Sequence, residues 1–272
     1  LVSTHAAALA LACARRILGF DRDAKAGIWD FQRHMPIIGL PDCRVGVVAF
    51  GNIARSFIKK MTPFGPEIIV NDPFVPDGTI RDFGAIPVDF DELVRTSDII
   101  SLHAPLTPET RHLFGEEQFK AMRPNAYLIN TARGGLIDEK ALYRAIVEKQ
   151  IAGAALDTTE PEPPEKDNPL LTLDNIILTP HAAFYSERSL KQLHLVAIQD
   201  AIRVLEGGVP TVIANKDVVP RGGHTRKRKL STVLGWLNLQ PLSRWQFAQV
   251  GLSIYAVRCL RILTPESLWE VR

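Results

Sequence analysis

Side chains that transfer protons or bind anions follow three short apolar runs of the chain. Arg133, Asp157 and His181 each come shortly after such a run, and Glu162 lies on the proline-rich loop beyond Asp157. A guanidinium group offers two parallel donors to a carboxylate. An imidazole beside an acid can take up and return a proton near neutral pH. Together these groups match the needs of hydride transfer between a nicotinamide and a hydroxy acid.

Each of these residues also has a purely structural interpretation. Arg133 can be a surface turn arginine, Glu162 a solvated loop acid, and His181 a hydrogen-bonded histidine at the end of a strand. For any one residue the two interpretations are about equally good. We favour the chemical one for the set, because all of them follow apolar runs that are expected to end at one edge of a sheet.

The apolar runs alternate with amphipathic stretches, which predicts an α/β fold with a doubly wound parallel sheet of the Rossmann type. Helical patterns cover residues 53–61, 138–148 and 187–205, and an apolar helix is expected over residues 3–17. The expected strands are residues 45–50, 68–70, 99–102, 127–129, 152–156 and 176–178.

The first strand leads into a fingerprint turn of the Gly-x-Gly-x-x-Gly type over residues 49–54, with alanine at the first and third glycine positions. Gly51 lets the backbone approach a pyrophosphate, which the N-terminus of the next helix can bind. Ala54 is an accepted replacement. Ala49 is tolerable there only if its φ angle is negative, which is the expectation.

Asp72 follows Gly51 by 21 residues and stands at the end of the second apolar run. An acid at this point accepts hydrogen bonds from the adenosine ribose and repels a 2′-phosphate, which predicts NAD rather than NADP as the cofactor. The alternative is an ordinary Asp-Pro turn with Pro73.

Composition is that of a globular chain, with 46% apolar and 23% charged residues. The three cysteines are far apart and have no Cys-x-x-Cys pair, so neither a disulfide framework nor a zinc site is expected. They favour a reducing compartment, and we expect a cytoplasmic protein. No targeting segment or membrane helix is indicated, because the apolar stretch 6–14 is too short to span a bilayer.

Charge is distributed unevenly along the chain. Residues 1–215 hold 22 Lys and Arg against 27 Asp and Glu, whereas residues 216–272 hold 10 against 3. A basic stretch can bind nucleic acid or a membrane surface, but is more often simply solvated, so we expect neither partner.

Four longer strings resemble the family of D-isomer-specific 2-hydroxyacid dehydrogenases, which includes D-3-phosphoglycerate dehydrogenase, and in particular its branch containing the C-terminal-binding proteins. The resemblance covers about residues 1–217. The strings are VGVVAFGNIA (45–54), SDIISLHAPLTPET (97–110), NTARGGLIDE (130–139) and TPHAAFYSE (179–187).

This resemblance implies roles for individual residues. The catalytic arginine, glutamate and histidine of the family fall on Arg133, Glu162 and His181, and the contact with the nicotinamide carboxamide falls on Asp157. Phe184 is expected to touch the substrate. The cofactor contacts implied besides Asp157 are Gly51, Asn52, Ile53, Asp72, Thr110 and Thr131.

The resemblance also implies a domain organisation. An NAD-binding domain is expected over residues 1–184, with a helix and an arm at 1–43 and the Rossmann core at 44–184. A helix returning toward the substrate lobe is expected at 185–215, followed by a basic tail at 216–272. The first helix and the arm around Trp29 resemble segments with which such enzymes dimerise, so a homodimer is expected.

Two functions remain open at this point. The first is an NAD-dependent oxidoreductase acting on a D-2-hydroxy acid and its 2-oxoacid, with a phosphoglycerate-like substrate as one option. The chain starts after the family's N-terminal lobe, so most of the substrate domain is expected to be absent and turnover to be poor. The alternative is a dimeric module that binds NAD and presents a surface to protein partners. A remnant without function is a third possibility.

Overall fold

The computed structural model describes residues 1–211 and 213. The chain divides into two units, Leu1–Tyr185 and a second unit that starts at Ser186. The second unit contains helix α8 (Glu187–Leu205), which begins with a capping box made by Ser186 and Ser189. The expected basic tail at 216–272 lies outside the described residues.

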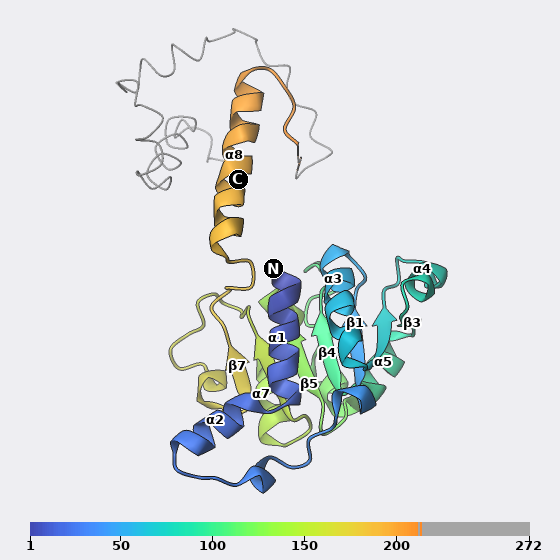
Figure 1. The fold of residues 1–272 in the computed structure, drawn as a ribbon, viewed down its shortest axis with the longest axis vertical. Coiled ribbons are helices and arrows are strands. Elements are labelled where there is room, and N and C mark those ends of the chain that lie inside the picture. Colours follow the sequence, from blue (N-terminus) through green and yellow to red (C-terminus); the bar gives the residue numbers. More distant parts are fainter. Residues whose placement is uncertain (212, 214–272) are drawn as a thin grey trace. The chain divides into compact units, whose positions relative to one another are not determined.

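The first unit is built on a seven-stranded sheet in which every neighbouring pair is parallel (Figure 1). The strand order β3-β2-β1-β4-β5-β6-β7 changes direction between β1 and β4. This order confirms the doubly wound prediction and places the switch point, where such sheets bind ligands, at β1 and β4. The strands are β1 (Arg44–Val48), β2 (Glu67–Asn71), β3 (Ile86–Pro87), β4 (Ile99–Leu102), β5 (Tyr127–Asn130), β6 (Gly153–Leu156) and β7 (Ile176–Leu178).

Helices cover both faces of this sheet. Alternate strand residues point to opposite faces, so Val45 and Val47 pack on one side while Val48 packs on the other. One face is covered by α1 (Val2–Ala14), α3 (Asn52–Met61) and α4 (Asp77–Asp82), and the other by α5 (Phe90–Thr96), α6 (Glu116–Ala121) and α7 (Glu139–Val147).

Strand β3 was not expected from the sequence. It has only two residues, Ile86 and Pro87, and pairs with the edge of β2. A proline cannot donate to a ladder and is tolerated in an edge strand of this kind. The apolar stretch 85–88 that contains it is short and includes Pro87, which argues against a strand in the sequence pattern.

The first helix ends earlier than the expected 3–17. It stops at Ala14, Arg16 takes a left-handed φ of 50°, and a second helix, α2 (Ile17–Lys25), continues in a new direction. The expectation that the first helix is largely buried is confirmed for Ala6, Ala10 and their neighbours. The boundary was missed because Ile17 and Leu18 extend the apolar pattern beyond the turn, although both are exposed.

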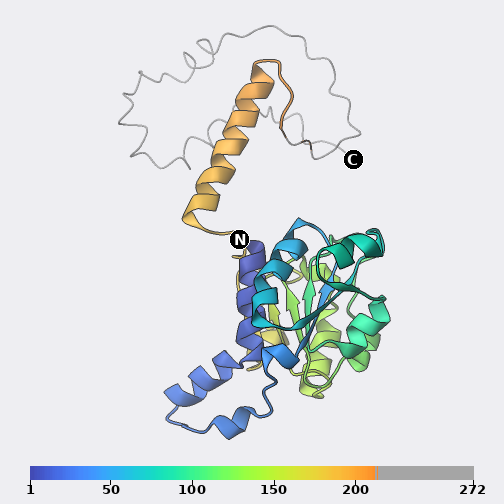
Figure 2. The ribbon, with the colours of Figure 1, turned by 45° about the vertical axis from the view of Figure 1, so that its right-hand side comes forward.

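Residues 17–39, called the arm below, project from the body of the domain (Figure 2). The arm is held by Asp23, whose Oδ2 lies 3.1 Å from His34 Nε2 and 3.3 Å from Arg33 Nε. Gly19 lies under His34, because a Cβ there would stand 2.6 Å from the ring carbon Cε1. The arm is therefore an ordered element, held together by a cluster of polar contacts around Asp23.

The described part of the chain has neither a candidate membrane-spanning helix nor a candidate metal cluster. None of its helices combines the length and apolar character needed to cross a bilayer. It also contains no group of three or more His, Cys, Asp or Glu side chains that could hold a metal ion. Cys13 and Cys43 are free and buried, whereas Cys259 lies outside the described residues.

Candidate active site

The loops that carry the expected site residues all leave the carboxyl ends of the parallel strands. Gly51 follows β1, Asp72 follows β2, and Arg133 follows β5. Asp157 and His181 follow β6 and β7 in the same way. Because every strand runs in one direction, these loops share one edge of the sheet, as ligand sites of such folds do.

The turn after β1 differs from the expectation at Ala49. Its φ is +72°, in the left-handed region, rather than negative. The backbone is held in this shape because the amide of Ala49 donates to Asn71 O at 2.8 Å, which extends the β1–β2 pairing beyond the strand. The fingerprint turn therefore needs the glycine-like conformation even where the residue is alanine, at a cost of about 1–2 kcal/mol.

Gly51 sits beyond this turn as the N-cap of α3, with a φ of −73°. A Cβ added to it would meet nothing within 4 Å. Neither the backbone angle nor the packing inside the chain therefore requires glycine here. Open space above an uncapped helix N-terminus is the arrangement that lets a pyrophosphate approach the backbone.

Asp72 connects the ends of β1 and β2. Its Oδ2 accepts the amide of Phe50 at 2.8 Å, and its Oδ1 accepts the amide of Phe74 at 2.9 Å. The bond to Phe74 closes the Asp-Pro turn, which was the alternative interpretation of Asp72 from the sequence. The bond to Phe50 places the carboxylate beside the loop of Gly51. The structure thus brings Asp72 and Gly51 together.

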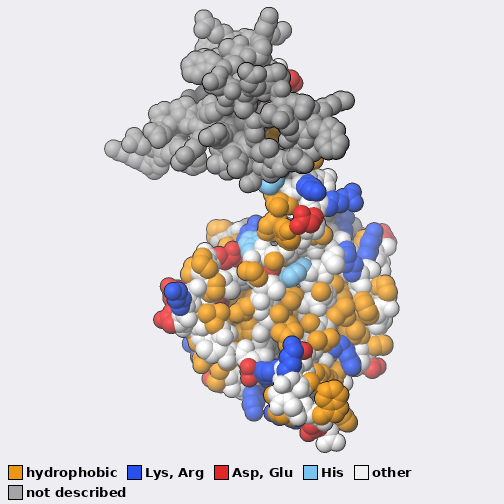
Figure 3. All heavy atoms as spheres, turned by 60° about the vertical axis from the view of Figure 1, so that its left-hand side comes forward, with side chains coloured by type: hydrophobic (Ala, Val, Ile, Leu, Met, Phe, Trp, Pro, Cys, Tyr) orange, Lys and Arg blue, Asp and Glu red, His pale blue; other side chains and the backbone are white. Residues whose placement is uncertain are grey.

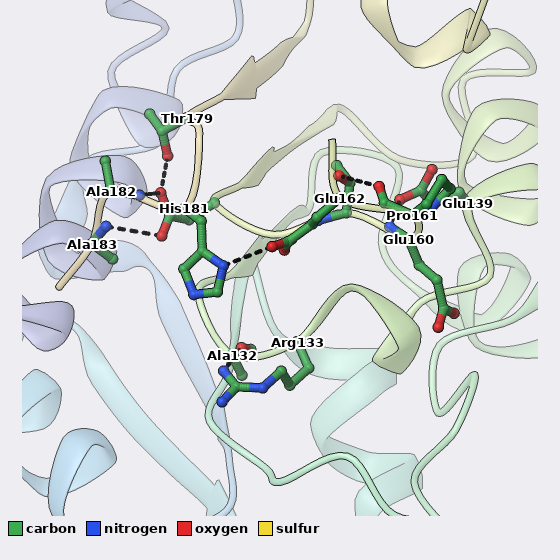
Figure 4. A network of polar contacts seen from close by, with 12 residues as sticks. Ala132, Arg133, Glu139, Glu160, Pro161, Glu162, Thr179, His181, Ala182 and Ala183 are labelled. Carbon is green, nitrogen blue, oxygen red and sulfur yellow. Dashed lines mark hydrogen bonds and ion pairs between the residues drawn. The ribbon is translucent and has the colours of Figure 1, made fainter. Parts of the chain in front are cut away.

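His181 and Glu162 form a direct pair at the other end of the edge (Figure 4). The distance from His181 Nδ1 to Glu162 Oε2 is 2.8 Å, and Glu162 Oε1 accepts the amide of Thr159 at 3.3 Å. An ionised carboxylate only accepts hydrogen bonds, so Nδ1 carries the proton of this contact. The other ring nitrogen, Nε2, is then the atom that can exchange a proton with a substrate.

Arg133 lies below the imidazole in Figure 4, on the side away from Thr179. Its Nη1 donates to Ala132 O at 2.6 Å. The turn that carries it is fixed by the buried Asn130, whose side chain donates to Arg133 O at 2.8 Å and accepts from the amide of Ala132 at 3.0 Å. Asn130 thus fixes the backbone of this turn, and the bond to Ala132 O holds the guanidinium on the side of the histidine seen in Figure 4.

Asp157 is fully buried and acts as an anchor for the turn of His181. Its Oδ1 accepts from the amide of Ala182 and its Oδ2 from the amide of Ala183, both at 2.9 Å, and the hydroxyl of Thr179 also donates to Oδ1. His181 itself has a left-handed φ of 50°. Such strained residues persist only where their surroundings hold them, and they cluster at functional sites.

Two buried threonine hydroxyls near this edge have no hydrogen-bond partner within the described chain, those of Thr131 and Thr158. A buried hydroxyl without a partner is costly, so each is free to bond a water molecule or a ligand. Thr131 is one of the expected cofactor contacts. Thr110, another of these, already donates to Pro105 O at 2.7 Å and so shapes its own loop.

Asn52 and Ile53, the remaining expected contacts, form the first turn of α3 next to Gly51 and are exposed. Sequence reasoning did not single out Asn130, Thr158 or His5, which contacts Thr179. The sequence feature that could have revealed these three residues is a polar side chain inside an apolar helix or strand, or directly after one.

Comparison with known proteins identifies the family. Residues 7–183 match the profile of the D-isomer specific 2-hydroxyacid dehydrogenase, NAD binding domain. The chain belongs to this family, and its first unit is an NAD-binding domain of the Rossmann type.

The chain is 43% identical over 214 residues to a D-3-phosphoglycerate dehydrogenase of Methanocaldococcus jannaschii, which covers 78% of this chain and 40% of the relative. It is 37% identical to a glyoxylate reductase of Korarchaeum cryptofilum, covering 78% of this chain and 65% of the relative. The chain thus spans less than two thirds of the length of these relatives.

Solved structures agree with this assignment. An NAD-complexed D-isomer specific 2-hydroxyacid dehydrogenase of Lactobacillus delbrueckii ssp. bulgaricus superposes with a TM-score of 0.70 at 29% identity, covering 79% of this chain and 69% of the other. A D-lactate dehydrogenase with NAD+ from Lactobacillus jensenii superposes with a TM-score of 0.72 at 25% identity, covering 79% and 68%.

Proposed function

We propose that the chain takes part in hydride transfer between NAD and a D-2-hydroxy acid or its 2-oxoacid. The observation that carries this proposal is the 2.8 Å contact between His181 and Glu162 beside Arg133, at the carboxyl edge of an NAD-binding sheet. Two of the relatives are named D-3-phosphoglycerate dehydrogenase and glyoxylate reductase. The first substrates to test are therefore small 2-hydroxy acids, including a phosphorylated one.

The residues present fit the cofactor. The open space at Gly51 accommodates a pyrophosphate, and the unpartnered hydroxyl of Thr131 is available to the bound dinucleotide. We assign the adenosine ribose to Asp72, and Asn52 and Ile53 provide backbone amides at the start of α3. NAD supplies the hydride acceptor or donor when it is bound.

Arg133 and His181 divide the work on the substrate. The guanidinium of Arg133 binds the substrate carboxylate and polarises the neighbouring carbonyl. His181 gives a proton from Nε2 to the carbonyl oxygen during reduction and takes it back during oxidation. Glu162 orients the ring through its contact with Nδ1.

We also propose that two copies associate through the arm. Several large apolar side chains of the arm are exposed, and Trp29 is 91% and Phe31 67% accessible. Figure 3 displays apolar side chains, in orange, at the lower end of the domain, where Figure 1 places the arm. Exposed aromatic side chains on a projecting ordered element are typical of an interface.

We place the protein in a reducing compartment, the cytoplasm, because Cys13 and Cys43 are free thiols.

The proposed reaction is tested by comparing variants of one chain. NADH oxidation with glyoxylate or another 2-oxoacid should fall by about 10²–10⁴-fold in His181→Ala, the usual contribution of general acid–base catalysis. Arg133→Ala should weaken use of the 2-oxoacid while leaving NADH affinity nearly unchanged. A wild-type chain that binds NADH, dimerises and reduces no 2-oxoacid above the rate of His181→Ala would contradict the proposal and favour a binding module.

A further inference from the structure

We propose that His5, on the first helix, is a positioning residue that holds the turn of His181 in its working shape. It acts through Asp157 and Thr179, which follow β6 and β7; 174 residues separate His5 from Thr179. The structural part of this inference stands on the contacts alone, and its catalytic consequence rests on the proposed function.

The contacts form a continuous relay. His5 Nε2 lies 3.0 Å from Thr179 Oγ1 and 3.5 Å from Asp157 Oδ1. Thr179 Oγ1 in turn donates to Asp157 Oδ1. Asp157 then receives the backbone amides of Ala182 and Ala183, which directly follow His181. Figure 4 shows Thr179, Ala182 and Ala183 close together around the turn of His181.

The relay determines which atom of His5 carries a proton. The hydroxyl hydrogen of Thr179 is committed to the carboxylate of Asp157, which only accepts. Thr179 Oγ1 can therefore offer His5 only a lone pair. It follows that His5 Nε2 is the donor and carries hydrogen, whatever the state of Nδ1.

The N–H group of His5 supports the buried carboxylate of Asp157 through the hydroxyl of Thr179. The carboxylate of Asp157 has no solvent exposure, so its charge has to be compensated by donors within the protein. It anchors a tight turn in which His181 has the unfavourable φ of 50°. The amide of His181 also donates to Asp157 O at 2.8 Å. Weakening one donor to the Asp157 carboxylate loosens the amide bonds of Ala182 and Ala183, and with them the direction of the His181 ring.

The position of His5 argues against a simple packing role. Helix α1 is otherwise made of alanine, leucine and small residues that pack on β5 and β6. The side chain of His5 is 26% exposed, and unlike the alanine and leucine side chains of the helix it has a polar contact, because its Nε2 lies 3.0 Å from Thr179 Oγ1 at the end of β7.

The test uses three variants of the full chain. His5→Leu removes the donor, His5→Gln keeps an N–H donor near the place of Nε2, and Thr4→Ala is a matched control at an exposed position of the same helix. Hydrogen exchange of the Ala182 and Ala183 amides, followed by 15N NMR, reports the turn. The amides of Val47 and Ile129 report the stability of the core.

We expect exchange at Ala182 and Ala183 to accelerate about tenfold in His5→Leu relative to the core amides, the effect of losing one hydrogen bond. His5→Gln and Thr4→Ala should behave like the wild type. Unchanged exchange in His5→Leu, or acceleration spread equally over Val47 and Ile129, would overturn the proposal. If His5→Leu does not fold, Thr179→Val interrupts the same relay and should give the same local acceleration.

A binding experiment separates this inference from the proposed function. His5→Leu should weaken NADH several-fold, while ADP-ribose, which lacks the nicotinamide, should bind as it does to the wild type. Equal weakening of both ligands would overturn the local role. A wild-type chain that binds neither ligand would refute the proposed function, and the exchange experiment would still decide the role of His5.

Discussion

Burial shifts the pKa values of individual side chains in this domain. His103, directly after β4, has its Nε2 3.0 Å from Ser101 Oγ and its ring 5.2 Å from that of Phe57. Burial disfavours the charged imidazolium and lowers the pKa of His103 from 6.5 to about 4. The residue therefore remains neutral in the folded chain at neutral pH.

This depressed pKa predicts an acid-sensitive stability. Below pH 6.5 the unfolded chain binds a proton at this histidine that the folded chain does not bind until about pH 4. The free energy of unfolding is therefore unaffected by the titration of His103 above pH 6.5. It falls by up to about 3 kcal/mol as the pH decreases from 6.5 to about 4. Urea unfolding at several pH values should show a flatter profile for His103→Gln. An identical slope in both proteins would contradict this assignment.

The thiols of the described residues follow the same principle. Burial raises the pKa of Cys13 to about 12 and that of Cys43 to about 11. Because the thiolate is the reactive form, neither should react with iodoacetamide in the folded chain at pH 8. Peptide mass mapping after native and denatured labelling checks this, and rapid native labelling of either residue would disprove it.

At the scale of elements, the turn between β1 and α3 carries a removable strain. Ala49 has a φ of +72°, which glycine adopts without a steric penalty. Ala49→Gly should therefore raise the free energy of unfolding by about 0.5–1 kcal/mol, after the greater chain entropy of glycine is subtracted. Thermal or denaturant unfolding measures the change. A lower stability of the variant would mean that the methyl group of Ala49 packs more favourably than the strain costs.

Elements with a strong pattern were predictable from the sequence, and short or strained ones were not. Strands β4 and β7 begin and end at the predicted residues because uninterrupted apolar runs mark a buried parallel strand. Ala49 was mispredicted because its conformation is imposed by the bond to Asn71, a partner distant in the sequence. The contacts of His5 were invisible for the same reason, since 174 residues separate it from Thr179.

For the molecule as a whole, the exposed arm predicts a self-association that one residue can weaken. Trp29→Glu places a charge on a side chain that is 91% exposed in the single chain. The monomer should remain folded, while a dimer with this residue in its interface should dissociate at concentrations about a hundredfold higher. Phe74→Glu is the matched control, because Phe74 is 93% exposed and lies outside the arm. Sedimentation equilibrium that finds a wild-type monomer, or equal effects of both changes, would rule out this interface.

We propose that a dinucleotide lies across the carboxyl edge, with its pyrophosphate on the backbone at Gly51. NADH titration of the wild type, Gly51→Val and Gly78→Ala, followed by nucleotide fluorescence, tests it most directly. Both glycines have open space for a side chain, so both variants should fold with nearly unchanged melting temperature. We predict saturable NADH binding to the wild type and to Gly78→Ala, and loss of at least about tenfold in affinity for Gly51→Val. Undiminished NADH binding by Gly51→Val would contradict the account.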